Sequence, residues 1–248
     1  MKKMTKDQKI PEMNSAAVLP YRRILAKHRA ALILKRIFDI TAALVLIILL
    51  APVMIIIAAA VAIDSPGGVF YRQTRVTAFC REFRIIKFRT MRADADKSGP
   101  AVTSGGDARI TRVGRILRGC RLDELPQLFN VLAGDMSFVG TRPEVPKFVA
   151  KYTPEMYATL LLPAGITSEA SIRFKDEAEL IGDSDDPEAD YVNIILPMKM
   201  KCNLDAIRNF SLMGEAGTLV RTVLAVLGKD YSGSADKPQK KCKKVGDR

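Results

Sequence analysis

Residues 41–63 read TAALVLIILLAPVMIIIAAAVAI and contain no charged side chain. A run of roughly twenty or more apolar residues is long enough for a helix to cross a bilayer. The run begins far from the N-terminus and is followed by Asp64-Ser65-Pro66-Gly67, so it lacks the short apolar core and small-residue cleavage site of a secretory signal. We therefore expect this segment to stay in the protein and to hold it in a membrane.

The charges and the proline of this segment restrict its path. Basic side chains flank both ends, and the positive-inside rule places both on the cytoplasmic side. Pro52 removes a backbone hydrogen bond and clashes with the preceding turn, so it predicts a break in the helix. A tilted, kinked single span and a re-entrant helix that returns through one leaflet both fit these residues. The flanking cations are Lys27, Arg29, Lys35 and Arg36 before the run and Arg72, Arg75, Arg81 and Arg84 after it.

The composition favours an anionic partner and gives no sign of a zinc site, a disulfide framework or histidine acid–base chemistry. Lys and Arg number 39 against 27 Asp and Glu, a net charge of +12, which suits nucleic acid, a phosphorylated substrate or acidic lipid. The four cysteines are far apart with no CxxC pair, so neither a zinc site nor a disulfide framework is indicated. The single histidine, His28, lies among basic residues, so histidine acid–base chemistry is not expected.

Two short segments after the apolar run have the character of strands. Residues 69–73 and 83–89 alternate β-branched or aromatic residues with polar ones, which predicts a small β-hairpin. A period of two places Lys87 and Arg89 on one face, where two aligned cations would suit a diphosphate. The alternative is an ordinary solvated face.

The densest chemical signal is at residues 108–137, ARITRVGRILRGCRLDELPQLFNVLAGDMS. Arginines recur every three residues from Arg109 to Arg121, and the run ends on Asp123-Glu124. An arginine series alone could bind lipid headgroups or nucleic acid, but neither ligand explains two carboxylates at its end. The acidic pair therefore requires its own explanation.

Pro126 and the apolar spacing after the acidic pair predict an amphipathic helix that starts near Asp123. At a helix N-terminus the dipole and free N–H groups favour negative charge, so we expect Asp123 to be ionised with a phosphate alongside. Consecutive helical residues point about 100° apart, which allows one carboxylate to be a nucleophile and the other a metal ligand. The alternative is that both acids only cap the helix.

Residues 121–144, RLDELPQLFNVLAGDMSFVGTRPE, resemble the bacterial sugar transferase family, the monotopic phosphoglycosyl transferases. Further blocks resemble this family in the family's order: KRIFDI (35–40), DSPGGVFYRQTRV (64–76), FRIIKFRTM (83–91) and DARITRVGRILR (107–118). The later LPAGITSEASIRFKDEAEL (162–180) resembles a subgroup of the family, and the stretch through Thr222 is a weaker match, so the resemblance covers about three-quarters of the chain.

The resemblance implies a re-entrant helix broken at Pro52 and an active site on the cytoplasmic face of the bacterial inner membrane. It implies that Asp123 attacks the sugar-linked phosphorus of a UDP-sugar, releases UMP, and passes the sugar phosphate to polyprenol (undecaprenyl) phosphate. Glu124 would hold Mg²⁺. The cations expected to bind substrate phosphates are Lys87, Arg89, Arg112, Arg115 and Arg118, with Arg142 at the family's nucleotide-associated arginine.

Four positions depart from the family's pattern. Ala51 replaces the usual Ser before the helix-breaking proline, and the kink then depends on Pro52 alone. Thr77 stands where glycine is usual and Thr141 where proline is common, which affects the loops near the nucleotide rather than the acidic pair. Near the C-terminus, Glu215 occupies what looks like a usual aspartate position, and sugar selection is the property expected to differ.

Together these patterns predict an α+β fold, mainly helical with a small β-hairpin and one re-entrant membrane helix. The expected segments are a polar and basic stretch at 1–34, the membrane helix at 35–63, a cytosolic catalytic domain at 64–228 and a basic disordered tail at 229–248. Another class of function is a non-catalytic basic anchor for anionic lipid or nucleic acid, but it leaves the acidic pair unexplained. A multi-span transferase would need a second apolar run of bilayer length, which the sequence lacks. We therefore expect membrane lipid as a partner and no nucleic acid.

Overall fold

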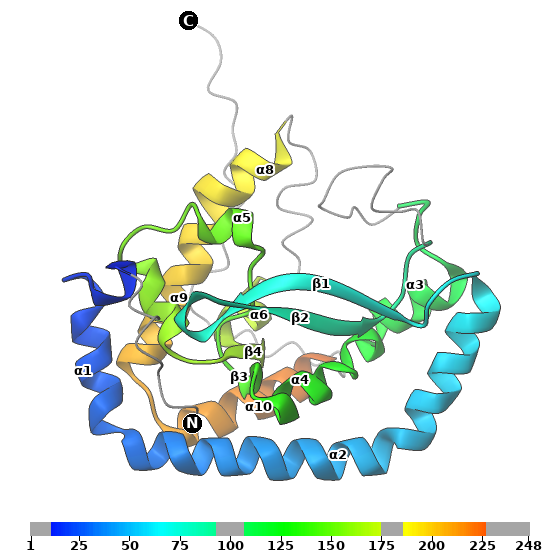
Figure 1. Cartoon of the computed structure of the whole chain (residues 1–248), viewed down its shortest axis with the longest axis horizontal. Coiled ribbons are helices and arrows are strands. Elements are labelled where there is room, and N and C mark those ends of the chain that lie inside the picture. Colours follow the sequence, from blue (N-terminus) through cyan, green and yellow to red (C-terminus); the bar gives the residue numbers. More distant parts are fainter. Residues whose placement is uncertain (1–10, 93–106, 175–185, 227–248) are drawn as a thin grey trace, which may run out of the picture.

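The computed structural model describes residues 11–92, 107–174 and 186–226. Its longest element, helix α2 (Arg29–Asp64), forms one edge of the molecule in the view of Figure 1. In that view the other described elements all lie to the same side of α2. Helix α1 (Leu19–Lys27) stands at one end of α2. The described chain is mainly helical with two small sheets, as predicted for an α+β fold.

Helix α2 is continuous but bends in its second half (Figure 1). Pro52 lies inside the helix and provides a physical cause, since it donates no backbone hydrogen bond and crowds the turn before it. The helix begins before the predicted boundary of 35, because residues 29–34 (RAALIL) are good helix formers. Within the described residues, α2 is the one helix that is long and apolar enough to cross a membrane.

Both ends of α2 are fastened to the same domain. Near its start, the carboxylate of Asp39 accepts a hydrogen bond of 2.8 Å from the hydroxyl of Ser137. At its end, Asp64 accepts one of 3.0 Å from the backbone N–H of Val113. Between these contacts many apolar side chains face outward: Val45, Ile48, Leu49, Ile55 and Ile56 are each more than 60% exposed.

The predicted hairpin is confirmed. Strands β1 (Phe70–Thr77) and β2 (Arg81–Phe88) pair antiparallel along their full length. The buried side chains Phe83 and Ile85 lie two positions apart on β2 and pack in one apolar cluster, as the period-two pattern requires. Phe88, three positions further on, packs in a separate cluster with Ile57 and Val61 of α2.

A second sheet was not predicted. Strands β3 (Met136–Val139) and β4 (Ala164–Thr167) are parallel, and helix α4 (Gln127–Ala133) leads into β3. Gly140 and Gly165 bring their backbones together here, since a Cβ on Gly165 would lie 2.2 Å from the backbone nitrogen of Gly140. Only glycine fits such an approach, and it fixes the start of the loop that follows β3.

The polar and basic stretch predicted at 1–34 is ordered over residues 11–34. A 3₁₀ turn (Pro11–Asn14), α1 and the first turns of α2 occupy this region. Met13, Val18, Tyr21 and Leu25 are buried in the largest apolar cluster. Their apolar surface repays the ordering of the backbone although the surrounding sequence is polar. Residues 1–10 and the predicted tail at 229–248 lie outside the described residues.

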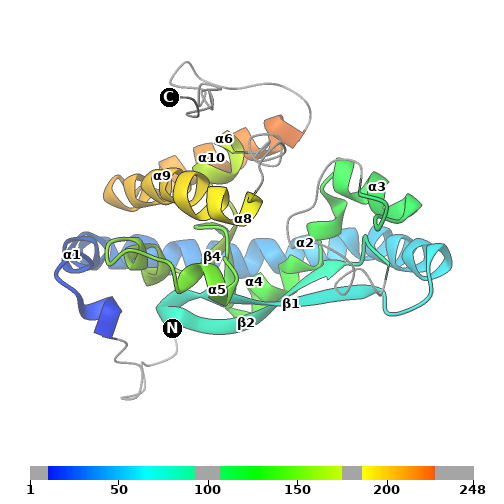
Figure 2. The ribbon, with the colours of Figure 1, turned by 90° about the horizontal axis from the view of Figure 1, so that it is seen from above.

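The remaining helices form the other walls of the domain. Helices α6, α8, α9 and α10 gather on the side of α2 away from the hairpin (Figure 2). Lys35 of α2 links to this group through an ion pair of 2.6 Å with Glu215. The bounds are α3 (Arg112–Gly119), α5 (Pro146–Val149), a 3₁₀ segment (Met156–Leu161), α6 (Glu169–Arg173), α8 (Pro187–Asp190), a π-helical segment (Tyr191–Ile195), α9 (Leu196–Arg208) and α10 (Leu212–Val226).

Candidate active site

The acidic pair lies in a short 3₁₀ turn, Leu122–Glu124, between α3 and α4. The prediction that an α-helix starts near Asp123 is therefore wrong, because α4 begins only at Gln127. Pro126 has no N–H to donate to the carbonyl of Leu122, and the N–H of Leu125 closes the turn instead, at 3.3 Å. The pair is thus set in a tighter turn than an α-helix would provide.

Glu124 is held by two cations. Its Oε1 atom accepts a hydrogen bond of 2.8 Å from Nζ of Lys87 on β2 and one of 2.9 Å from Nη2 of Arg142. Its side chain is 13% exposed. Burial raises the pKa of Glu124, but the charges of Arg142 and Lys87 outweigh burial and hold that pKa well below its ordinary value. Glu124 is therefore a fixed negative charge at neutral pH.

Asp123 has a different environment. It is 8% exposed, and no hydrogen bond to its carboxylate is found among the described residues. Burial raises the pKa of Asp123, and the charge of Glu124 raises it further, while the cations Lys87 and Arg118 lower it. Burial thus outweighs the neighbouring cations and raises this pKa, whereas a helix terminus would have lowered it, and the ionised state of Asp123 stays a prediction.

Arg118 is the predicted α3 cation whose charge acts on the acidic pair. Its charge acts on Asp123, and its Nε atom donates a hydrogen bond of 2.9 Å to the hydroxyl of Thr90. Helix α3 can approach Thr90 because Gly114 packs against it: a Cβ there would lie 2.1 Å from the Thr90 carbonyl oxygen. Thr90 was not singled out from the sequence, although it belongs to the FRTM block at 88–91.

The other predicted cations lie in two kinds of place. Arg112 and Arg115 are exposed on α3, with no described contact to the acidic pair. Arg89 donates hydrogen bonds of 2.8 and 2.6 Å to the carbonyls of Pro66 and Ser65. Strand β2 ends at Phe88, so the alternation that should align Lys87 with Arg89 is interrupted. Arg89 therefore fastens the end of α2 to the hairpin, and its role in binding a substrate phosphate stays a prediction.

The loop that carries Arg142 has a fixed backbone on either side of it. The carbonyl of Thr141 accepts a hydrogen bond of 2.9 Å from Gly165 N–H, and that of Pro143 accepts one of 3.0 Å from Nη1 of Arg75. Thr77, at the family's glycine position, donates to a backbone carbonyl at 2.6 Å and accepts from a backbone N–H at 3.1 Å. Its hydroxyl thus joins the hairpin to the β3 and β4 region.

The acidic pair fits a magnesium ion only in company with a substrate. Among the described residues no group of three or more His, Cys, Asp or Glu side chains comes together. Mg²⁺ commonly uses one or two protein carboxylates and takes its other ligands from phosphates and water. Two carboxylates beside clustered cations are consistent with that arrangement, and the Mg²⁺ role of Glu124 stays a prediction.

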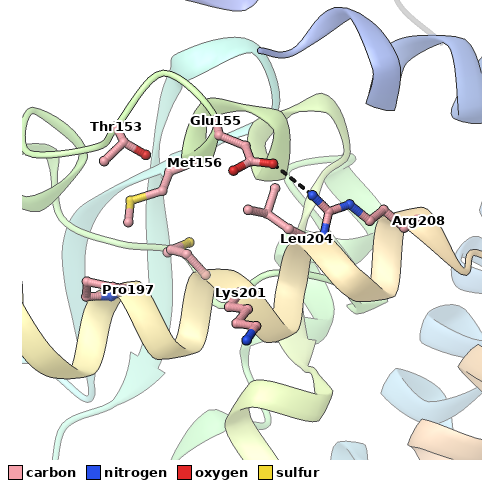
Figure 3. A pocket seen from close by; sticks show the side chains of 8 residues that line it. Thr153, Glu155, Met156, Pro197, Lys201, Leu204 and Arg208 are labelled. Carbon is pink, nitrogen blue, oxygen red and sulfur yellow. Dashed lines mark hydrogen bonds and ion pairs between the residues drawn. The ribbon is translucent and has the colours of Figure 1, made fainter.

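A pocket lies elsewhere, between α9 and residues 153–156 (Figure 3). Arg208 crosses one side of it to pair with Glu155 at 2.9 Å, and Met156 and Leu204 supply apolar lining. It contains neither carboxylate of the acidic pair nor any predicted phosphate-binding cation. The acidic pair therefore stays the candidate active site.

The family follows from a match along most of the chain. The family model described as bacterial sugar transferase matches residues 30–229. The chain therefore belongs to the bacterial sugar transferase family.

Three curated relatives have informative names. The UDP-N-acetylgalactosamine-undecaprenyl-phosphate N-acetylgalactosaminephosphotransferase of Aeromonas hydrophila is 37% identical over 78% of this chain and 44% of its own length. The UDP-glucose:undecaprenyl-phosphate glucose-1-phosphate transferase of Caulobacter vibrioides is 37% identical over 79% of this chain and 70% of its own. The exopolysaccharide production protein PSS of Rhizobium leguminosarum bv. phaseoli is 37% identical over 81% of this chain and 99% of its own. The match thus spans less than half of the Aeromonas protein and almost all of the Rhizobium protein.

Proposed function

We propose that this protein transfers a sugar 1-phosphate from a UDP-sugar to polyprenol phosphate and releases UMP, the first step in assembling a glycan on a lipid. The observation that carries this proposal is the buried Asp123, which accepts no described hydrogen bond beside the cations Lys87 and Arg118. The names of the Aeromonas and Caulobacter relatives support the reaction class.

The proposed reaction has two displacements at one phosphorus. An oxygen of ionised Asp123 attacks the phosphorus that bears the sugar, and the bond to UMP breaks with its electron pair leaving on the UMP phosphate. The enzyme then carries the sugar phosphate as an acyl phosphate on Asp123. An oxygen of polyprenol phosphate attacks the same phosphorus, the bond to Asp123 breaks, and the carboxylate is regenerated.

The surrounding charges fit this chemistry. Phosphoryl transfer depends mainly on positioning and on compensating negative charge. Arg142 and Lys87 converge on Glu124 and can reach a diphosphate bound there. When bound by Glu124 and the substrate, Mg²⁺ would add positive charge that helps UMP leave. Arg118 lies on the Asp123 side, where its charge offsets that of the nucleophile and the sugar phosphate.

We propose a re-entrant path for α2 in the cytoplasmic leaflet of the inner membrane. A straight crossing would place the two ends of the helix on opposite sides of the bilayer. In the described structure both ends contact the same domain, through Asp39 and Asp64, and the helix bends. The exposed apolar side chains between these contacts favour a lipid environment.

Cysteine labelling tests this path. In a variant without native cysteines, Lys27→Cys and Arg72→Cys place a thiol at exposed positions before and after α2. A membrane-impermeant maleimide added to intact spheroplasts should label neither position, and lysis should make both reactive. Labelling of one position in intact spheroplasts would contradict the re-entrant path.

The reaction is tested with purified protein in nanodiscs containing undecaprenyl phosphate, Mg²⁺ and a panel of UDP-sugars. We expect UMP and a lipid-linked sugar in equal amounts with one sugar of the panel. Glu188→Gln is a suitable control, since it alters an exposed ion pair with Lys147. Salt-sensitive lipid binding without UMP release from any UDP-sugar would instead support the non-catalytic anchor.

A further inference from the structure

Behind the loop that carries Arg142 lies a buried polar cluster of three side chains. Glu144, Tyr191 and Lys199 are 6%, 6% and 4% exposed. The hydroxyl of Tyr191 donates a hydrogen bond of 2.6 Å to Oε1 of Glu144. Nζ of Lys199 donates one of 3.2 Å to the Tyr191 hydroxyl and lies 3.6 Å from Oε1 of Glu144. The cluster joins the Arg142 loop to the α9 region.

General stability is a poor explanation for such a cluster. Removing an acid and an amine from water costs several kcal/mol per ion, and apolar residues of similar volume are often as stable. Buried polar groups are instead well suited to select one arrangement of the chain. Tyr191 also begins the π-helical segment Tyr191–Ile195, a rare conformation that is frequent near functional sites.

The part of the chain that this cluster can hold in one conformation is the loop that carries Arg142. Glu144 lies two residues after it, and residues 141–145 have no regular secondary structure. The backbone carbonyl of Glu144 accepts a hydrogen bond of 3.0 Å from the N–H of Val76, while its carboxylate is bound by Tyr191. Both the backbone and the side chain of Glu144 are thus held, which fixes the direction from which Arg142 reaches Glu124.

We infer that Glu144, Tyr191 and Lys199 are positioning residues that hold Arg142 for binding the diphosphate of the nucleotide sugar. This inference rests on the proposed function. None of the three has a described contact with Asp123 or Glu124, so they act through Arg142. Loosening them should weaken binding of the nucleotide and leave the displacement at Asp123 largely intact.

The mildest test is Tyr191→Phe, which removes the bridging hydroxyl and keeps the ring. We expect KM for the UDP-sugar and the dissociation constant of UMP to rise about tenfold while kcat changes less than about twofold. Glu188→Gln is a matched control. Glu188 forms an exposed ion pair of 2.8 Å with Lys147, and this pair also joins the chain just after Glu144 to the segment before Tyr191. The control should leave KM unchanged.

A second variant separates positioning from folding. Glu144→Gln with Lys199→Met removes both buried charges, which should keep the melting temperature near that of the wild type. We expect its KM for the UDP-sugar to be higher than that of the wild type although its melting temperature is unchanged. Wild-type KM in this double variant and in a folded Tyr191→Phe protein would overturn the inference.

A double-mutant cycle tests whether the effect passes through Arg142. In an Arg142→Ala background, Tyr191→Phe should cause no further loss of UMP affinity measured by calorimetry. An equal loss in both backgrounds would overturn the inference. If the wild type turns over and the variants have an unchanged KM, only the positioning role is refuted. If the wild type neither turns over nor binds UMP, the proposed function is refuted as well.

Discussion

The two carboxylates of the acidic pair, Asp123 and Glu124, are both buried but have different surroundings. On one side, Lys87 and Arg142 donate charge-assisted hydrogen bonds to Glu124, and its pKa falls. On the other, Asp123 is buried with cations nearby but has no described hydrogen bond, and its pKa rises. Burial opposes ionisation at both residues, so direct contact with a cation decides the sign.

This difference suggests a division of labour. A carboxylate that already accepts two strong hydrogen bonds is a poor nucleophile but a firm anchor for cations and for a metal bound with substrate. A desolvated carboxylate without donors keeps its electron pairs available for attack on phosphorus. These environments support the two roles that the family resemblance implies.

The largest expected effect is that of Asp123→Asn. The amide preserves the shape of the side chain but cannot form the acyl phosphate, so UMP release should fall by a factor of about 10⁴ or more. Steady-state UMP release in nanodiscs measures this, with Glu188→Gln as the unaffected control. A loss of less than about tenfold would remove Asp123 from the role of nucleophile.

Glu124→Gln should have a smaller effect. The nucleophile remains, but Lys87 and Arg142 lose the charge that aligns them, and we expect a decrease in kcat of about 10²-fold. Rising Mg²⁺ should recover part of the lost rate if Glu124 is a metal ligand. A loss equal to that of Asp123→Asn, with no response to Mg²⁺, would break the comparison between the two residues.

The same two variants should shift stability in opposite directions. The pKa of Asp123 is higher in the folded than in the unfolded protein, so its ionised form costs folding free energy at neutral pH, and Asp123→Asn should raise the melting temperature. Glu124 has a lowered pKa and contributes stability above the unfolded-state pKa, so Glu124→Gln should cost about 2 kcal/mol at pH 7. Circular dichroism melting is a suitable measurement, since the chain has no tryptophan. Shifts of the same sign would contradict the opposite environments.

The smallest effect concerns pH. Asp123 must be ionised to attack, so UMP release should fall in acid with a midpoint above the ordinary aspartate pKa of 3.8. Arg118→Met removes a charge that lowers this pKa and should move the midpoint to higher pH. Arg81→Met, which alters a pair with Asp135 on the hairpin, should leave it in place. A midpoint that does not respond to Arg118 would show that another group titrates.

Local patterns predicted much of this molecule. The alternation at 83–89 predicted the second strand of the hairpin, and Pro52 with the apolar run predicted a long, bent helix. The family blocks directed attention to Asp123, Glu124, Lys87 and Arg142, which the fold brings together. These features depend on neighbours in the chain or on quoted motifs, so a sequence can display them.

Long-range features were missed for a physical reason. The pairing of β3 with β4 involves strands of four residues each, too short for a clear period. The cluster of Glu144, Tyr191 and Lys199 joins residues about fifty positions apart, which no local spacing records. The raised pKa of Asp123 likewise depends on burial by the whole domain, whereas local sequence indicates only the effect of a nearby helix terminus.

The central claim, that Asp123 carries the sugar phosphate, is tested most directly without an acceptor. Protein in nanodiscs that lack polyprenol phosphate is mixed with its UDP-sugar, and UMP and intact protein mass are followed together. The account predicts a burst of one UMP per protein and a sugar phosphate adduct on the peptide containing Asp123, both absent in Asp123→Asn. UMP release only after acceptor is added, with no adduct at any time, would contradict it.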